Sequence, residues 1–141
     1  TYLFEWSSDY PSILKKNIIK KKFSLGFQNE KINFKSVKIR HGKIFALGYV
    51  FKNIAYISDC SSVSEKSIKA LTNLNTLIID CLRFKPHYSH LNFDEVIKLV
   101  NILKPKKTIL TNMHIDLDYK YLKKKTPKNI CPGYDGMKIY A

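Results

Sequence analysis

The chain has 141 residues, of which 45% are hydrophobic and 13% aromatic. This is enough apolar material for one domain with a core, and it excludes a wholly disordered chain. A run of about twenty uncharged apolar residues is absent, which excludes a membrane-spanning helix, and no signal peptide is recognisable. The three cysteines, Cys60, Cys81 and Cys131, form no CxxC pair. They therefore predict neither a disulfide framework nor a thiolate zinc site, and they favour a reducing, cytoplasmic setting.

The formal net charge of +14 is typical of proteins with an anionic partner such as nucleic acid or phosphate. However, nearly all of the positive charge comes from lysine, and arginine occurs only at Arg40 and Arg83. Nucleic-acid readers favour arginine for bidentate contacts. We therefore attribute the charge mainly to the composition of an AT-rich genome. A functional basic surface, formed by residues 15–22 and 123–125, remains the alternative.

The first half of the chain predicts strands. Residues 1–6 alternate as a strand, and residues 13–22 form a short basic helix or loop. Strands follow over residues 23–27 and 32–39, with an interruption at residues 40–43. Residues 45–51 and 54–58 then form a hairpin around the two-residue turn at Lys52 and Asn53.

The second half predicts alternating helices and strands. Ser64 caps a helix, and Asn92 caps an amphipathic helix over residues 93–103. Residues 76–79 and 108–110 are short apolar runs, typical of strands buried on both faces. A basic helix lies around Tyr121, and residues 130–141 form a final hairpin turned at Asp135 and Gly136. We predict an α/β fold with antiparallel strands first and βαβ units after them.

Potential ligands lie at the ends of the predicted strands. His41, Asp59, Asp80 and His114 each follow a strand, and His87 and His90 lie in the loop after Asp80. Asp59 has two interpretations, because an aspartate before a serine-rich turn is also a common helix cap. Strand ends gather along one edge of an open sheet. Histidine and aspartate together bind Zn²⁺, Mn²⁺ or Fe²⁺, so the pattern predicts a hydrolytic metal site.

Several stretches of the sequence resemble a known superfamily. His41-Gly42, residues 47–51 (LGYVF) and residues 55–59 (AYISD) resemble the metallo-β-lactamase superfamily. Residues 79–90 (IDCLRFKPHYSH), 110–119 (LTNMHIDLDY) and 134–137 (YDGM) are similar to its phosphoribosyl 1,2-cyclic phosphate phosphodiesterase branch. The resemblance covers nearly the whole chain from His41 onward, with the motifs in the order of the family.

The resemblance implies a dinuclear centre of two divalent ions, Zn²⁺ or Mn²⁺. His41 would be the third histidine ligand of the first metal, Asp59 would bridge both metals, and His114 would complete the second. His90 would contact the substrate phosphate or assist the leaving group, with His87 as a further substrate contact. The catalytic residues would therefore be Asp59 and His90. Two ions held by a bridging carboxylate suit the binding of a phosphoryl group.

Two further residues of the stretch 79–90 are expected to support the metal ligands. Asp80 and Arg83 would act beneath the metal ligands, for example as an ion pair under the loop.

One defining motif of the superfamily, H-x-H-x-D-H, does not occur in the sequence. The resemblance implies an αββα sandwich, and residues 1–141 read as a single partial domain, the C-terminal portion of that fold. We therefore expect a fragment of a protein roughly twice as long or somewhat less, since such enzymes exceed one typical compact domain. We also expect the chain to be catalytically inactive alone.

The predicted function is metal-dependent hydrolysis of a cyclic phosphate or a similar phosphodiester. One alternative is an RNA-processing nuclease of the same superfamily, and another is a non-catalytic basic module that binds nucleic acid. The expected partner is a small phosphorylated substrate; nucleic acid is not favoured, no membrane is involved, and a homodimer stays open.

Overall fold

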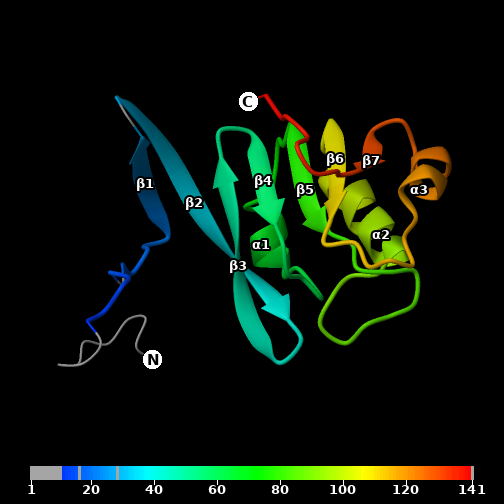
Figure 1. Ribbon diagram of the computed structural model, residues 1–141, viewed down its shortest axis with the longest axis horizontal. Coiled ribbons are helices and arrows are strands. Elements are labelled where there is room, and N and C mark those ends of the chain that lie inside the picture. The colour runs from blue at the N-terminus through cyan, green and yellow to red at the C-terminus, as the bar shows by residue number, and fades with distance from the viewer. Residues whose placement is uncertain (1–10, 16, 28, 141) are drawn as a thin grey trace.

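The computed structural model describes residues 11–15, 17–27 and 29–140, and in it one mixed sheet of seven strands organises the chain. The strands lie side by side in chain order (Figure 1). They are β1 (Lys22–Phe27), β2 (Glu30–His41), β3 (Ile44–Phe51), β4 (Ile54–Ile57), β5 (Thr76–Asp80), β6 (Lys107–Thr111) and β7 (Ile130–Pro132). The first four pair antiparallel, and β4 to β7 pair parallel. This confirms the predicted α/β class with antiparallel strands first.

Strand β2 is longer than its sequence pattern predicted. We expected an interruption at residues 40–43, but Arg40 and His41 continue the ladder by pairing with Phe45 and Ile44. Only Gly42 and Lys43 form the turn, and Gly42 adopts φ +58°, a conformation that glycine accepts without strain. The ladder therefore carries His41 to the very end of a rigid strand.

Helices connect the parallel strands. They are α1 (Glu65–Ile68), α2 (Phe93–Leu103) and α3 (Tyr119–Lys125). The bounds of α2 agree with the prediction because its signals are local: Asn92 and Glu95 form a capping box at its start. Lys104 ends the helix in the left-handed conformation, just before Pro105. No helix in the described part of the chain is long and apolar enough to cross a membrane.

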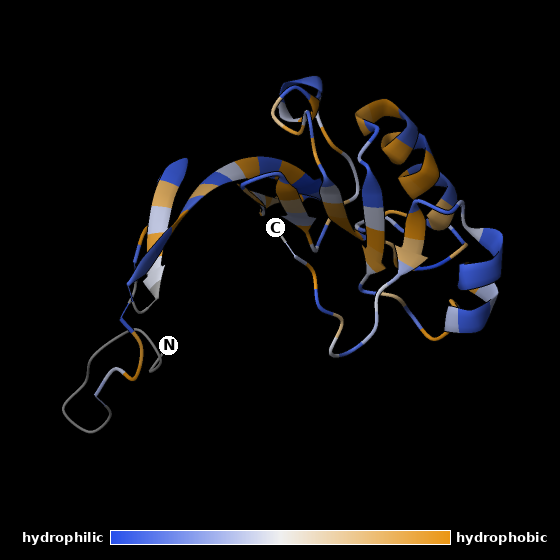
Figure 2. Ribbon diagram, turned by 90° about the horizontal axis from the view of Figure 1, so that it is seen from above, coloured by the Kyte–Doolittle hydropathy of each residue, from blue (hydrophilic) through white to orange (hydrophobic). Residues whose placement is uncertain are grey.

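The core lies between the sheet and the helices α1 and α2. These helices cover one face of the sheet, whereas the C-terminal tail crosses the opposite face (Figure 2). The covered face buries Ile39, Ile57, Leu77, Ile79, Leu110 and the α2 residues Val96, Leu99, Val100 and Leu103. On the other face, Leu25, Ile32, Leu47 and Tyr56 remain exposed. The sheet therefore has one closed face and one largely open face.

The predicted C-terminal hairpin is wrong. Residues 135 and 136 do form a turn, but β7 has only three residues and pairs parallel to β6. Pro132 has no N–H to donate to a further strand, and Gly133 N–H instead donates to Leu110 O at 2.8 Å. Of the N-terminal predictions, the strand over residues 1–6 lies outside the described residues. The described part of residues 13–21 forms neither helix nor strand.

Candidate metal centre

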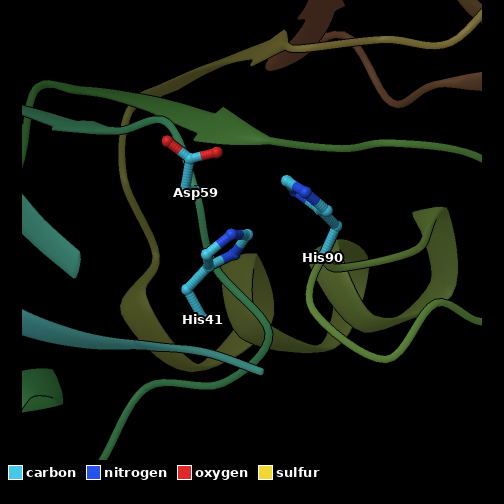
Figure 3. Close-up of side chains that lie close together, drawn as sticks. All are labelled: His41, Asp59 and His90. Carbon is cyan, nitrogen blue, oxygen red and sulfur yellow. The ribbon is translucent and has the colours of Figure 1, made fainter. Parts of the chain in front are cut away.

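The C-terminal ends of β2, β4, β5 and β6 lie on one edge of the sheet, because these strands run in the same direction. At this edge the structure brings together His41 from the end of β2, Asp59 from just after β4 and His90 from the loop after β5. One ligand atom of each lies within 4.8 Å of the other two, and all three residues are half-buried (Figure 3). The spacing suits side chains that converge on one cation.

A backbone carbonyl orients the ring of His41. Its Nδ1 lies 2.8 Å from Ser89 O. A carbonyl oxygen only accepts hydrogen bonds, so Nδ1 must carry the proton and Nε2 is left with a free lone pair. The turn beside His41 is fixed as well, because Gly42 N–H donates to Ser61 Oγ at 3.1 Å. A hydrogen bond from Nδ1–H to a carbonyl, with Nε2 left free, is common in histidines that bind metals.

A buried carboxylate orients His90 in the same way. His90 Nδ1 lies 2.8 Å from Asp80 Oδ2, and the Asp80 side chain is fully buried. Asp80 also accepts hydrogen bonds from Cys60 N–H at 3.1 Å and Asn112 Nδ2 at 2.9 Å. Burial raises the pKa of Asp80, while the hydrogen bonds from Asn112, Cys60 and His90 oppose that rise. The carboxylate holds the Nδ1–H tautomer, and His90 Nε2 is left available at the group.

The structure resolves the two interpretations of Asp59. The cap of α1 is Ser64, whose hydroxyl accepts from Ser67 N–H, so Asp59 is not the cap of that helix. Asp59 Oδ2 instead accepts from Ser58 Oγ at 2.9 Å, which leaves lone pairs on both carboxylate oxygens.

The other two histidines are not part of this group. His114 is half-exposed, and its Nδ1 is 3.3 Å from Asp116 Oδ2. The metal-binding role of His114 therefore stays a prediction. The ring of His87 lies 5.3 Å from that of His90 and 4.9 Å from that of Tyr88, at the rim of the group.

The expected ion pair between Asp80 and Arg83 is wrong. Arg83 donates instead to the carbonyls of Lys85 and Pro86, at 3.2 and 2.9 Å, and so ties the loop together. Sequence reasoning also missed Ser89 and Asn112. Ser89 acts through its backbone carbonyl, which leaves no signal in the sequence. Asn112 could have been found, because it follows directly after β6 on the edge where the ligands gather.

The buried cysteines near the group do not supply thiolates. Burial, together with the charge of Asp80, raises the pKa of Cys60 and of Cys81 to about 12. Both thiols are therefore protonated at neutral pH in the metal-free protein, and neither belongs to the group, whose donor set is two imidazole nitrogens and a carboxylate. That set fits Zn²⁺, Mn²⁺ or Fe²⁺, so His41, Asp59 and His90 would hold such an ion.

Comparison with known proteins agrees with this geometry. The family model described as the beta-lactamase superfamily domain matches residues 6–115. The chain belongs to the metallo-β-lactamase superfamily. Its seven-stranded mixed sheet and edge-located group match that fold.

Several relatives were found. A solved diphosphatase from the PhnP family is 29% identical with a TM-score of 0.80, and the match covers 87% of this chain and 47% of that one. It confirms the branch expected from the motifs. Human tRNase Z, short form, is 18% identical with a TM-score of 0.55, covering 83% of this chain and 46% of that one, and shows only a shared fold. A curated octanoyltransferase from Porphyromonas gingivalis is 26% identical over 139 residues, which are 96% of this chain and 28% of that protein.

The chain thus spans about half the length of these two solved relatives, 47% and 46%.

Proposed function

We propose that the protein containing this chain is a metal-dependent phosphodiesterase that hydrolyses a cyclic phosphate or a similar phosphodiester. The observation that carries the proposal is the group of His41, Asp59 and His90, in which each histidine is oriented through Nδ1. The likeness to a PhnP-family diphosphatase supports phosphate ester chemistry. Zn²⁺ or Mn²⁺, in a dinuclear centre, would supply electrophilic activation of the phosphoryl oxygens and of water.

Each residue of the site would have a distinct role in metal binding or catalysis. His41 would hold the first metal, Asp59 would be shared between the two metals, and His114 would take part in the second site. His90 would serve the metal through its Nε2 lone pair when no substrate is bound; against the substrate phosphate it would be protonated on both nitrogens and would give its Nε2 proton to the leaving oxygen. Asp80 stabilises the positively charged imidazole that this role requires, because its carboxylate is 2.8 Å from His90 Nδ1. His87, at the rim, is a further contact for the substrate.

We infer that the complete centre also needs ligands from elsewhere in the protein. Three converging residues leave coordination positions open for a tetrahedral or octahedral ion. The open face of the sheet is where a second layer of the fold would pack, as sheets with one apolar face require. The chain by itself is therefore expected to be inactive.

The test is an assay of the full-length protein with Zn²⁺ or Mn²⁺ on a phosphoribosyl cyclic phosphate and on bis(p-nitrophenyl) phosphate. Replacing Asp59→Asn or His41→Ala should lower kcat/KM by about a hundredfold or more, since loss of a ligand's hydrogen-bond partner alone costs about 10–100-fold. Asp135→Asn, a matched change in the exposed tail, should leave kcat/KM unchanged. Hydrolysis that survives both Asp59→Asn and a chelator would contradict the proposal.

RNA cleavage is the second candidate. The net charge of +14 and the fold shared with human tRNase Z favour it. A structured RNA precursor cut at one site, with no turnover of small cyclic phosphates, would replace the first candidate by the second.

A further inference from the structure

A basic groove lies beside the metal group and plays no part in it. It has a volume of about 680 Å³ and runs along the edge of β2, between the start of β1 and the segment around α1. Five cationic residues line it: Lys21, Lys35, Lys38, Arg40 and Lys66. They come from three separate segments of the chain, so the fold and not a local lysine run brings them together. Along β2, the side chain of Lys35 lies on one side of the strand and those of Lys38 and Arg40 on the other.

The floor of the groove is β2, and its two walls are the segments around Lys21 and around Ser62 and Ser67. Hydrogen bonds attach both walls to β2. Ser36 N–H donates to Lys21 O at 2.9 Å on one side, and Arg40 N–H donates to Ser62 O at 3.1 Å on the other. Ser67 Oγ, which is nearly buried, donates to Lys38 O at 2.7 Å. Both walls are therefore attached to β2, and the groove exists before any ligand binds.

The charge in the groove is uncompensated within the described residues. None of the five cations lies within ion-pair distance of a described carboxylate. Phe45 instead holds two of them, because Lys38 Nζ lies 3.6 Å and the Arg40 guanidinium carbon 4.1 Å from its ring centroid. Like charges that share a groove repel one another, and a bound polyanion removes that cost.

The shape of the groove favours an extended anion over a compact one. Residues 35 to 40 of β2 span about 17 Å at the usual rise of a strand, enough for several phosphates. A groove of positive charge that follows a backbone is typical of proteins that bind single strands, whereas a duplex would contact only its rim. At its far end Arg40 is followed directly by His41 of the metal group.

We propose that this groove binds the sugar–phosphate backbone of single-stranded RNA and directs the strand toward the metal group. Binding in the groove stands on its own. Only the delivery of a phosphodiester to the metal group rests on the proposed function, so binding is measured in EDTA, where catalysis plays no part.

The experiment measures binding of a labelled oligouridylate of about 12 nucleotides to the full-length protein across a salt series. Each phosphate contact on a single strand contributes about −0.7 to the slope of log K against log salt. The double variant Lys38→Gln, Lys66→Gln should make the slope shallower by about 1.4 and weaken binding at low salt. The control Lys124→Gln, Lys128→Gln has the same net charge, and its residues are exposed outside the groove. It should keep the wild-type slope.

A second variant changes no charge. Phe45→Ala releases Lys38 and Arg40 from the ring, so affinity should fall severalfold while the salt slope stays the same. Equal losses in the two double variants would overturn the groove in favour of diffuse charge. Competition by oligoglutamate as strong as that by unlabelled RNA, or by tripolyphosphate at equal phosphate, would overturn the polynucleotide as its ligand. Intact binding with no hydrolysis of any phosphodiester would refute the proposed function and leave the groove standing.

Discussion

At the scale of single residues, Asp80 is the group on which the candidate centre depends. It is fully buried and accepts hydrogen bonds from His90, Cys60 and Asn112. Three elements are thus joined at one carboxylate, and the ring of His90 is set by it. A buried charge is tolerated only when it is paired and hydrogen-bonded in this way.

Asp80→Asn should therefore impair metal binding without removing a candidate ligand. The amide is nearly isosteric but no longer stabilises the Nδ1–H of His90, and loss of such a partner typically costs about 10–100-fold in metal affinity. Titration calorimetry with Zn²⁺ on the full-length protein measures this. Asp94→Asn, an exposed change in the first turn of α2, is the control and should leave the affinity unchanged. Wild-type affinity in Asp80→Asn would mean that the pair is purely structural.

Asp80 also predicts a pH dependence of stability in the metal-free protein. Its pKa is raised above the ordinary value of 3.8, so the folded state binds this proton more tightly than the unfolded state. The stabilisation from Asp80 is therefore present at low pH and is lost as the pH rises from about 3.8 through the raised pKa. Urea unfolding of wild type and Asp80→Asn in EDTA should show the stability of the wild type, relative to the variant, falling over this window. A relative stability that rises instead would contradict the raised pKa.

At the scale of elements, the turn after β2 couples the strand to the ligand loop. A Cβ on Gly42 would come within 3.1 Å of Ser89 Cβ and 3.3 Å of the Tyr88 ring, and its φ of +58° disfavours any side chain. Gly42→Ala should therefore cost about 1–3 kcal/mol of unfolding free energy. It should also displace Ser89, which orients His41.

The measurement is urea unfolding, together with metal affinity, for Gly42→Ala. Gly136→Ala is an informative control, because its φ of +84° carries the same backbone penalty while no atom lies within 4 Å of the added Cβ. Only the Gly42 change should reduce metal affinity. Equal effects on metal affinity would argue that Gly42 acts only through its own backbone.

The elements also divide into those that the sequence predicts and those that it does not. The helix α2 is predictable to its ends because capping and periodicity are local. The end of β2 and the missing C-terminal hairpin depend on pairing between distant residues, such as Arg40 with Phe45. In the centre, His41 and Asp59 were identifiable as ligands because they follow strands, whereas His90 was expected at the substrate phosphate and His114 was expected in its place among the ligands. The hydrogen bonds from His41 to Ser89 O and from His90 to Asp80 could not be predicted, because they depend on contacts between residues that are distant in the sequence.

At the scale of the whole molecule, helices cover one face of the sheet, and the other face is largely open apart from the C-terminal tail. The aromatic rings of Phe23, Phe34 and Phe51 form a row across β1, β2 and β3 on the open face, with ring centroids 5.2 Å apart at each step; the first pair is stacked and the second is tilted. Tyr56 of β4 continues this face and is 40% exposed. An apolar face of this extent is normally a contact surface. We propose that further polypeptide of the same protein covers the aromatic part of this face, leaves the basic groove along the edge of β2 open, and supplies the remaining metal ligands.

Tyr56→Thr distinguishes the two states of this face, because threonine keeps the strand propensity and removes the ring. In the full-length protein the ring would be buried, so the variant should lose about 2 kcal/mol of unfolding free energy. In the 141-residue chain the ring is already partly in water, and the loss should stay below about 0.5 kcal/mol. Tyr140→Thr, a matched change at an 87% exposed side chain, serves as the reference in both proteins. Losses that are small and equal in both proteins would show that nothing covers Tyr56, and the remaining ligands would then have to reach His41 and Asp59 from another side.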